Sequence, residues 1–305
     1  MAPVNYGIWG KPTATLDWCE ENYIVTQFVA EFWNTISNWI MIIPPLLAAH
    51  LSWRKKMEFR IIASYLSVGF VGIGSLGFHC TLIYKMQLMD ELPMIYGTCI
   101  LLYGMLEIKS KENKMNTELT FFLFVISVFT TIMYVIVQNP LFFQWSYGIL
   151  AGSLFGLTFY NCKRYNGSVP LVLLSTLSYG FGFILWNIDN NFCPQIRTAR
   201  ALLPEFVKPV TQLHAWWHTL AGGGTYISVL YSSHLRLKCL GHQPLLKIYY
   251  HFLPIIEKND VVRNGTAIHK NDDNNNNNTN DKINTSKTIY ANGKHLNGVT
   301  FTRMK

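Results

Sequence analysis

Charged residues are scarce in this chain. Asp, Glu, Lys and Arg make up 14% of its 305 residues, the same share as the aromatic residues, whereas hydrophobic residues make up 50%. Apolar runs recur from about residue 32 to about residue 234, and about 20 mostly apolar residues suffice for a helix to cross roughly 30 Å of hydrocarbon. This composition predicts an all-α membrane protein with several spanning helices.

The features of a cleavable signal peptide are missing as well. The opening stretch, MAPVNYGIWGKPTATLDWCEENY, lacks a charged start followed by an apolar run, so we expect the first helix to act as its own insertion signal. We predict seven transmembrane helices. They are Phe32–Leu51, Ile61–Leu82, Met86–Leu106, Glu118–Val137, Pro140–Tyr160, Ser168–Ile188 and Thr211–His234.

Lys and Arg are distributed unequally between the loops on the two sides. Eleven fall on one side and five on the other, and positive residues are held on the cytosolic side. We therefore predict a luminal N-terminal arm (1–31), a seven-helix transmembrane domain (32–236) and a cytosolic tail (237–305). The net charge of +8 needs no nucleic-acid partner. The Asn-rich stretch NDDNNNNNTNDKINTSK predicts disorder from about residue 257.

Several ionisable residues fall near the luminal ends of these predicted helices. Polar side chains at membrane depth are costly and mark functional sites. Because separate helices contribute them at the same depth, we predict one polar layer. Its members are His79, Asp90, Glu91, Asp189, His214 and His218.

Within this layer the segment TQLHAWWHTLAGGG places His214 and His218 on one helical face. His79 would complete a three-histidine set that leaves the fourth tetrahedral position of zinc to water. Asp90 would act as general base on that water, and Ser75, one turn before His79, could donate a hydrogen bond to a developing oxyanion. We predict an intramembrane zinc site that attacks an amide or ester carbonyl presented from the bilayer.

Each of these residues also has a structural explanation. A histidine pair can be a packed, hydrogen-bonded feature of an aromatic helix. Asp90 could cap a helix, where a negative charge suits the dipole. Ser75 lies in a Gly-rich stretch that could serve close helix packing. Spacing alone leaves these alternatives open.

Longer motifs carry a resemblance to a known family. The stretches TLDWCEENY, AEFWNTISNWIMIIPP, GFHCTLIYKMQLMDELPMIY, LWNIDNNFC and TQLHAWWH, in order between about Gly7 and His234, resemble the alkaline ceramidases, a family of seven-helix intramembrane amidases, and most of all their alkaline ceramidase 3 (phytoceramidase) branch. The resemblance implies hydrolysis of the ceramide amide to a sphingoid base and a fatty acid in the endoplasmic reticulum or Golgi membrane. It also implies zinc on the three histidines, with Asp90 and Ser75 as catalytic residues.

A calcium site in the N-terminal arm is implied by the same resemblance. Its ligands fall on Asp17, the Trp18 carbonyl, Glu20, Asn22 and Glu31. Carboxylate and amide oxygens suit a hard cation, although the spacing and glycine of an EF-hand loop are absent. Without the resemblance, this acidic cluster would equally fit a solvated segment before a helix.

Cysteine is uncommon, with six residues in the chain. Cys19 lies in the arm and Cys193 follows the sixth predicted helix, so the predicted topology puts both in the lumen, where disulfides persist. The resemblance places a bridge at these two positions, and two free thiols are the alternative.

Two other functions are compatible with the residues alone. One is a seven-helix lipid-responsive receptor with a structural zinc site, and the other is a lipid carrier that binds without cleaving. The partner that we expect for the amidase is a ceramide-type lipid substrate from the bilayer. Turnover by the purified protein would separate the amidase from both.

Overall fold

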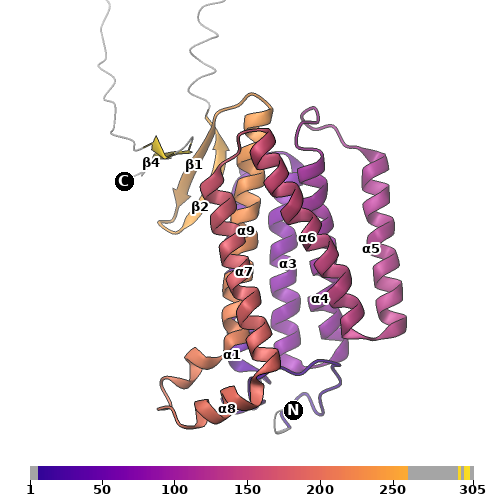
Figure 1. Ribbon diagram of the computed structural model, residues 1–305, viewed down its shortest axis with the longest axis vertical. Coiled ribbons are helices and arrows are strands. Elements are labelled where there is room, and N and C mark those ends of the chain that lie inside the picture. Colours follow the sequence, from indigo (N-terminus) through magenta and orange to yellow (C-terminus); the bar gives the residue numbers. More distant parts are fainter. Residues whose placement is uncertain (1–5, 260–294, 297–298, 303–305) are drawn as a thin grey trace, which may run out of the picture.

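The computed structural model describes residues 6–259, 295–296 and 299–302. Most of this part is helical, and the long helices stand side by side in a bundle, with the N-terminal arm and α8 at one end and a β-hairpin at the other (Figure 1). The helices are α1 (Phe32–Ser37), α2 (Trp39–Arg54), α3 (Phe59–Thr81), α4 (Tyr84–Leu106), α5 (Thr117–Val137), α6 (Pro140–Arg164), α7 (Val169–Asn191), α8 (Cys193–Ala201), the 3-10 helix η1 (Lys208–Thr211) and α9 (Leu213–Cys239). The strands are β1 (Pro244–Tyr249), β2 (Leu253–Lys258), β3 (His295–Leu296) and β4 (Val299–Thr302).

Each of the seven predicted apolar segments coincides with helix in the structure. The first is divided at Asn38 into α1 and α2, and the last begins as η1 and continues as α9 beyond the predicted end at His234. Within the described residues, four helical spans are long and apolar enough to cross a membrane. They are Phe32–Arg54, Phe59–Thr81, Thr117–Val137 and Val169–Asn191. The crossing of all seven stays a prediction.

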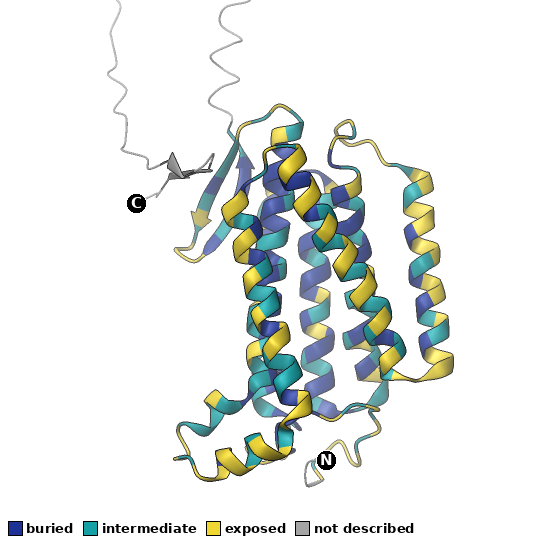
Figure 2. Cartoon of the chain, in the orientation of Figure 1, coloured by how far each residue is buried: buried dark blue, intermediate teal, exposed yellow. Residues whose placement is uncertain are grey.

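Helix α9 lies at the centre of the packing and contacts α1, α2, α3 and α7. Its approach to α7 depends on Gly224, where an added Cβ atom would lie 2.9 Å from the carbonyl oxygen of Ser175. Small residues allow such close helix packing in membranes. Helix α5 lies at the edge of the bundle, and Figure 2 shows most of its surface exposed. Its exposed side chains include Phe121 and Phe124, which suits a helix facing lipid.

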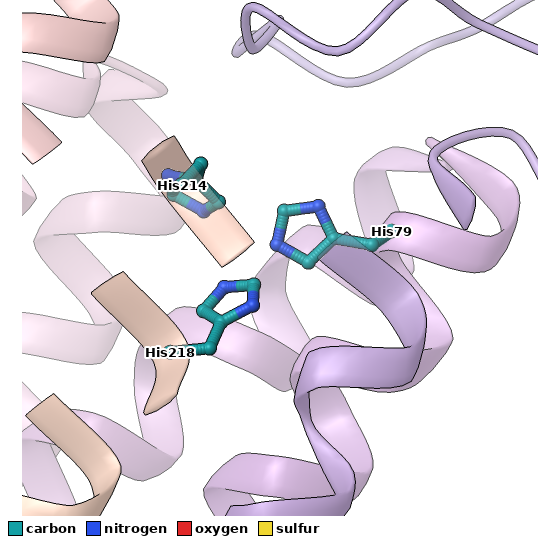
Figure 3. Close-up of side chains that lie close together, drawn as sticks. All are labelled: His79, His214 and His218. Carbon is teal, nitrogen blue, oxygen red and sulfur yellow. The ribbon is translucent and has the colours of Figure 1, made fainter. Parts of the chain in front are cut away.

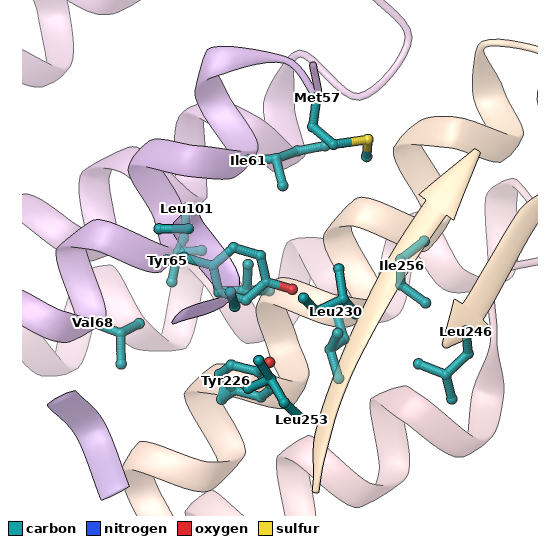
Figure 4. Close-up of a cluster of buried hydrophobic side chains, with 14 of the residues drawn as sticks. Met57, Ile61, Tyr65, Val68, Leu101, Tyr226, Leu230, Leu246, Leu253 and Ile256 are labelled. Atoms are coloured by element: carbon teal, nitrogen blue, oxygen red, sulfur yellow. The ribbon is translucent and has the colours of Figure 1, made fainter. Parts of the chain in front are cut away.

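The β-hairpin was not predicted. Strands β1 and β2 pair antiparallel, with Leu246 opposite Ile256, and the sheet order is β2-β1-β4-β3. The hairpin packs against helices α2 and α9, and its inner face joins a buried cluster that also includes Tyr65 of α3 (Figure 4). The hydroxyl of Tyr226 donates to the carbonyl of Pro254 at 2.7 Å. An ordered hairpin therefore precedes the Asn-rich stretch, and most of the predicted disorder after residue 257 lies outside the described residues.

A buried ion pair closes the same end of the bundle. Arg236, near the end of α9, is 1% exposed. Its Nε and Nη2 donate to the two oxygens of Glu58 at 2.7 and 2.9 Å, and its Nη1 donates to the carbonyls of Ile108 at 2.9 Å and Ser110 at 2.6 Å. This arginine thus joins α9 to the connections before α3 and after α4.

Candidate active site and metal centre

Three histidines meet at the arm end of the bundle. His79 lies in the last turn of α3, and His214 and His218 lie near the start of α9. Their rings point toward one another (Figure 3), and one nitrogen from each lies within 4.8 Å of the other two. All three side chains are buried. The structure thus brings together the residues that were predicted as zinc ligands.

Neighbouring polar groups hold the rings of two of these histidines. Nδ1 of His79 lies 2.5 Å from Oε2 of Glu31. Nδ1 of His218 lies 3.1 Å from the carbonyl oxygen of Asn34 and 2.8 Å from Oγ of Ser37. A carbonyl can only accept a hydrogen bond, so Nδ1 of His218 carries the proton and its Nε2 presents a lone pair. Glu31 gives His79 the same tautomer when its carboxyl group is ionised, as it would be beside a bound cation. This is the orientation that a metal-binding imidazole requires.

Unpaired atoms at the cluster fit a metal ion. Nε2 of His79 and Nδ1 of His214 are buried and have no hydrogen-bond partner among the described residues, and such burial costs free energy. The ring of His214 stacks on the indole of Trp18, with centroids 3.9 Å apart. Three buried imidazoles with converging lone pairs are a donor set that suits zinc and leaves a coordination position open.

Ser75 and Asp90 lie beside the histidines on facing turns of α3 and α4. Ser75 is one turn before His79, is 2% exposed, and hydrogen-bonds to the carboxyl group of Asp90. Gly74 permits this contact, because a Cβ atom there would lie 1.8 Å from the carbonyl oxygen of Met89. A larger residue at this position would push α4, and Asp90 with it, away from α3.

A cavity of about 770 Å³ extends into the bundle from this cluster. Ser75, Asp90 and Glu91 line it together with two of the histidines, while most of its surface is apolar and includes Phe143 and Tyr147. Its size lies within the range of pockets that hold small organic ligands, which is about 300–1,000 Å³. The chemistry-bearing residues therefore face a space that suits apolar chains.

The predicted calcium ligands lie in the arm and at the start of α1. Glu20, Asn22 and Glu31 are buried, whereas Asp17 is exposed. The carbonyl of Trp18 accepts a hydrogen bond of 3.2 Å from an arginine of α8. Trp18 is buried too, so four of the five residues predicted to bind calcium lie in a buried setting.

The acids of this set crowd one another. Glu20 accepts hydrogen bonds from two backbone N–H groups of α1 at 2.7 and 2.8 Å, but burial, together with the neighbouring Glu31, raises the pKa of Glu20 to about 8. Burial also holds the pKa of Glu31 well above its usual range, and the charge of Asp17 adds to this effect. Oε1 of Glu31 and Oδ1 of Asn22 are buried without a partner in the described part of the chain. A cation among these oxygens would offset the repulsion between the buried acids and would pair the oxygens that lack a partner, so the residues fit calcium.

A disulfide between Cys19 and Cys193 joins the arm to the start of α8. Their Cα atoms lie 5.2 Å apart, and 174 positions separate them in sequence. The carbonyl of Cys19 accepts hydrogen bonds from Arg197 and Arg200, both at 3.1 Å, and its N–H donates to Asp189 at 3.2 Å. These contacts hold the arm over the ends of α7 and α8, beside the stacked Trp18 and the histidines.

Supporting residues around the histidines were missed at the sequence level. Glu31 was assigned to calcium alone, yet one of its oxygens contacts His79. Asn34 and Ser37 received no role, although both contact His218. A signal existed, because polar residues in AEFWNTISNW recur at intervals of three or four, which is the spacing of one helical face.

Fold and site together describe a helical membrane protein with a three-histidine cluster at one end of a mostly apolar cavity. A model of the ceramidase family matches residues 10–257. The chain is 45% identical over 259 residues to alkaline ceramidase 3 of Mus musculus, covering 84% of this chain and 97% of that protein. It is 32% identical over 251 residues to alkaline ceramidase YPC1 of Saccharomyces cerevisiae, covering 76% and 79%.

The chain therefore belongs to the ceramidase family. Within that family it resembles alkaline ceramidase 3, which confirms the resemblance inferred from its motifs.

Proposed function

We propose that this chain is an alkaline ceramidase that uses zinc to hydrolyse the N-acyl bond of ceramides within the membrane. Family membership and the names of its relatives support the ceramidase activity. The zinc dependence rests on one observation. His79, His214 and His218 converge beside the cavity, and two of them keep buried nitrogens that no described residue pairs.

The residues around the histidines can divide the steps of amide hydrolysis between them. Zinc, when bound, would polarise the amide carbonyl and acidify the attacking water. Asp90 takes the proton of that water as the water oxygen adds to the carbonyl carbon. The same carboxyl group then gives the proton to the amide nitrogen as the C–N bond breaks. A sphingoid base and a free fatty acid leave.

Ser75 stabilises the charge that develops on the carbonyl oxygen. Its hydroxyl has one hydrogen to donate, and the carboxyl of Asp90 accepts it before the reaction. Once Asp90 has taken a proton from water, it no longer needs this donor. The serine hydroxyl is then free to donate to the oxyanion.

The orientation follows from the loops and the arm. We place seven helices across an endoplasmic reticulum or Golgi membrane, with the arm in the lumen and the tail in the cytosol. The unequal distribution of Lys and Arg supports this orientation, and so does the disulfide of the arm, since disulfides persist in the lumen. The acyl and sphingoid chains of the substrate would enter the apolar cavity from the bilayer.

A calcium ion would hold the arm against the bundle. Glu20, Asn22 and Glu31 supply buried oxygens for it, with Asp17 and the Trp18 carbonyl completing the proposed set. Because Oε2 of Glu31 contacts His79 while its Oε1 has no partner among the described residues, this one side chain can serve both ions.

The test is product formation from a ceramide panel. Purified protein should release sphingoid base and fatty acid in equal amounts, as measured by mass spectrometry. The His79→Ala variant should release neither. The His50→Ala variant, which changes an exposed histidine of α2, should keep wild-type turnover. A receptor or carrier would bind ceramide without releasing product, and that result would overturn the proposal. The comparisons give the receptor alternative no support.

A further inference from the structure

Glu91 is a second buried carboxyl group on the cavity wall. It follows Asp90 along α4, is 5% exposed, and lines the cavity. The mechanism above makes no use of it. Consecutive Cα atoms lie about 3.8 Å apart, so a molecule that reacts at Asp90 passes within reach of Glu91.

Neighbouring side chains fix one oxygen of this carboxyl group. The hydroxyl of Tyr134 donates to Oε2 of Glu91 at 2.5 Å, and Nε2 of Gln87 donates to the same oxygen at 3.1 Å. Gln87 is held in turn by the arm, where the N–H of Thr15 donates to its Oε1 at 2.8 Å. Tyr134 and Gln87 are both 0% exposed. The Glu91 side chain therefore has one orientation.

The other oxygen has a different setting. Both hydrogen bonds of Glu91 end on Oε2, and no residue in the described ranges donates to Oε1. A carboxyl oxygen that faces a mostly apolar cavity gains free energy when a ligand donates a hydrogen bond to it. Because Glu91 lines the cavity, a ligand in the cavity can supply the missing donor.

We propose that Oε1 of Glu91 accepts a hydrogen bond from a hydroxyl of the amino-alcohol headgroup, which makes Glu91 a specificity-determining residue for hydroxylated lipid amides. This inference rests on the proposed function, because it needs the amide of the substrate to lie at Asp90. In a ceramide, the headgroup hydroxyls stand on the two carbons next to the one that bears the amide nitrogen. An amide placed at Asp90 therefore brings a hydroxyl toward Glu91.

Glu91→Gln is a sharp test because the neighbours dictate how the new amide must lie. Tyr134 and Gln87 both donate to the position of Oε2, so the glutamine oxygen takes that place and its NH₂ group takes the place of Oε1. The variant keeps the size and both hydrogen bonds of the wild type. It replaces the acceptor that faces the cavity by a donor.

The substrates are three lipid amides with the same chains: a ceramide, its 1-deoxy analogue and its 3-deoxy analogue. For each we would measure kcat/KM, or the inhibition constant against ceramide where turnover is too slow. Glu91→Gln should lower kcat/KM, or raise the inhibition constant, by about 10- to 100-fold for the ceramide and for the analogue that keeps the recognised hydroxyl. This is the effect expected for one hydrogen bond to a charged group. The analogue that lacks this hydroxyl should change by less than about 2-fold. An equal loss on all three amides would overturn the proposal, because it would make Glu91 part of the hydrolysis itself.

Two further variants guard the result. Glu118→Gln, at an exposed position of α5, should leave all three values unchanged. If Glu91→Gln fails to fold, the same three amides are measured with Tyr134→Phe, which removes the hydroxyl that donates to Oε2 of Glu91. A loss limited to the hydroxylated amides would support the subsite, whereas a uniform loss or no loss would refute it. If the wild-type protein hydrolyses no ceramide, the proposed function fails, a result distinct from the failure of the subsite.

Discussion

Arg236 and the histidine cluster are both buried polar groups, but they lie at opposite ends of the bundle and differ in how they are paired. Arg236 donates to both oxygens of Glu58 and to several backbone carbonyls. At the other end, His79 and His214 keep nitrogens that no described residue pairs. Fully paired buried charges are explained by structure alone, whereas buried nitrogens that lack partners and also converge on one point fit a ligand. The comparison separates a structural contact from a functional site.

Removing a histidine should abolish activity at the histidine cluster without unfolding the end of the bundle that holds Arg236. His218→Ala takes away one of three ligands, so bound zinc should fall and turnover should drop by more than about 1,000-fold. Zinc content by mass spectrometry and ceramide turnover measure the two effects. His50→Ala is the matched control on an exposed face. Full zinc and normal turnover in His218→Ala would remove this residue from the site.

Changing the general base should separate chemistry from metal binding. Asp90→Asn keeps the shape of the side chain but cannot take up a proton, so turnover should fall by about 100- to 10,000-fold. Zinc should remain bound, because the three histidines are untouched. Parallel assays of zinc and of sphingoid base release test this. An Asp90→Asn protein with the wild-type rate would show that another group acts as base.

Removing the arginine should lower the stability of the fold and leave the histidine cluster intact. Arg236→Ala removes the side chain that donates to both oxygens of Glu58 and leaves only Arg60, at 3.6 Å, as its charged partner, which should lower the free energy of unfolding by up to about 3–5 kcal/mol. The folded fraction should keep its zinc. Thermal unfolding in detergent measures the loss. Lys238→Ala, at an exposed position of the same helix, should change stability little. Loss of zinc from folded Arg236→Ala protein would mean that the two ends are coupled.

Glu31 tests whether one side chain serves two ions. Glu31→Ala removes the oxygen that orients His79 and the oxygen that faces the arm. The affinity for zinc should therefore fall by about 10- to 100-fold, and the affinity for calcium should fall as well. Glu31→Gln keeps an acceptor for Nδ1 of His79 but loses the negative charge, so the affinity for calcium should fall more than the affinity for zinc. Isothermal titration with each ion compares the two variants. Equal behaviour of both variants toward zinc would exclude the orienting role.

The sequence predicted the long helices and the three histidines because both depend on strong local signals. Apolar runs of spanning length fix the helices, and polar residues at membrane depth are few, so His79, His214 and His218 stood out. The hairpin at residues 244–258 was missed because the face that it buries is set by its packing against α2 and α9. The contacts of Glu31, Asn34 and Ser37 were missed because they depend on how α1 is turned toward α9. That rotation is a property of the packing, and one sequence does not encode it in a local pattern.

The most direct test of the central claim is the metal content and turnover of a single preparation before and after chelation. The account predicts about one zinc per chain, as three histidine ligands would hold, loss of ceramide turnover when the zinc is removed, and recovery when zinc is returned. The unfolding temperature should show that the chelated protein is still folded. Full turnover of ceramide by folded protein that contains no metal would contradict the account.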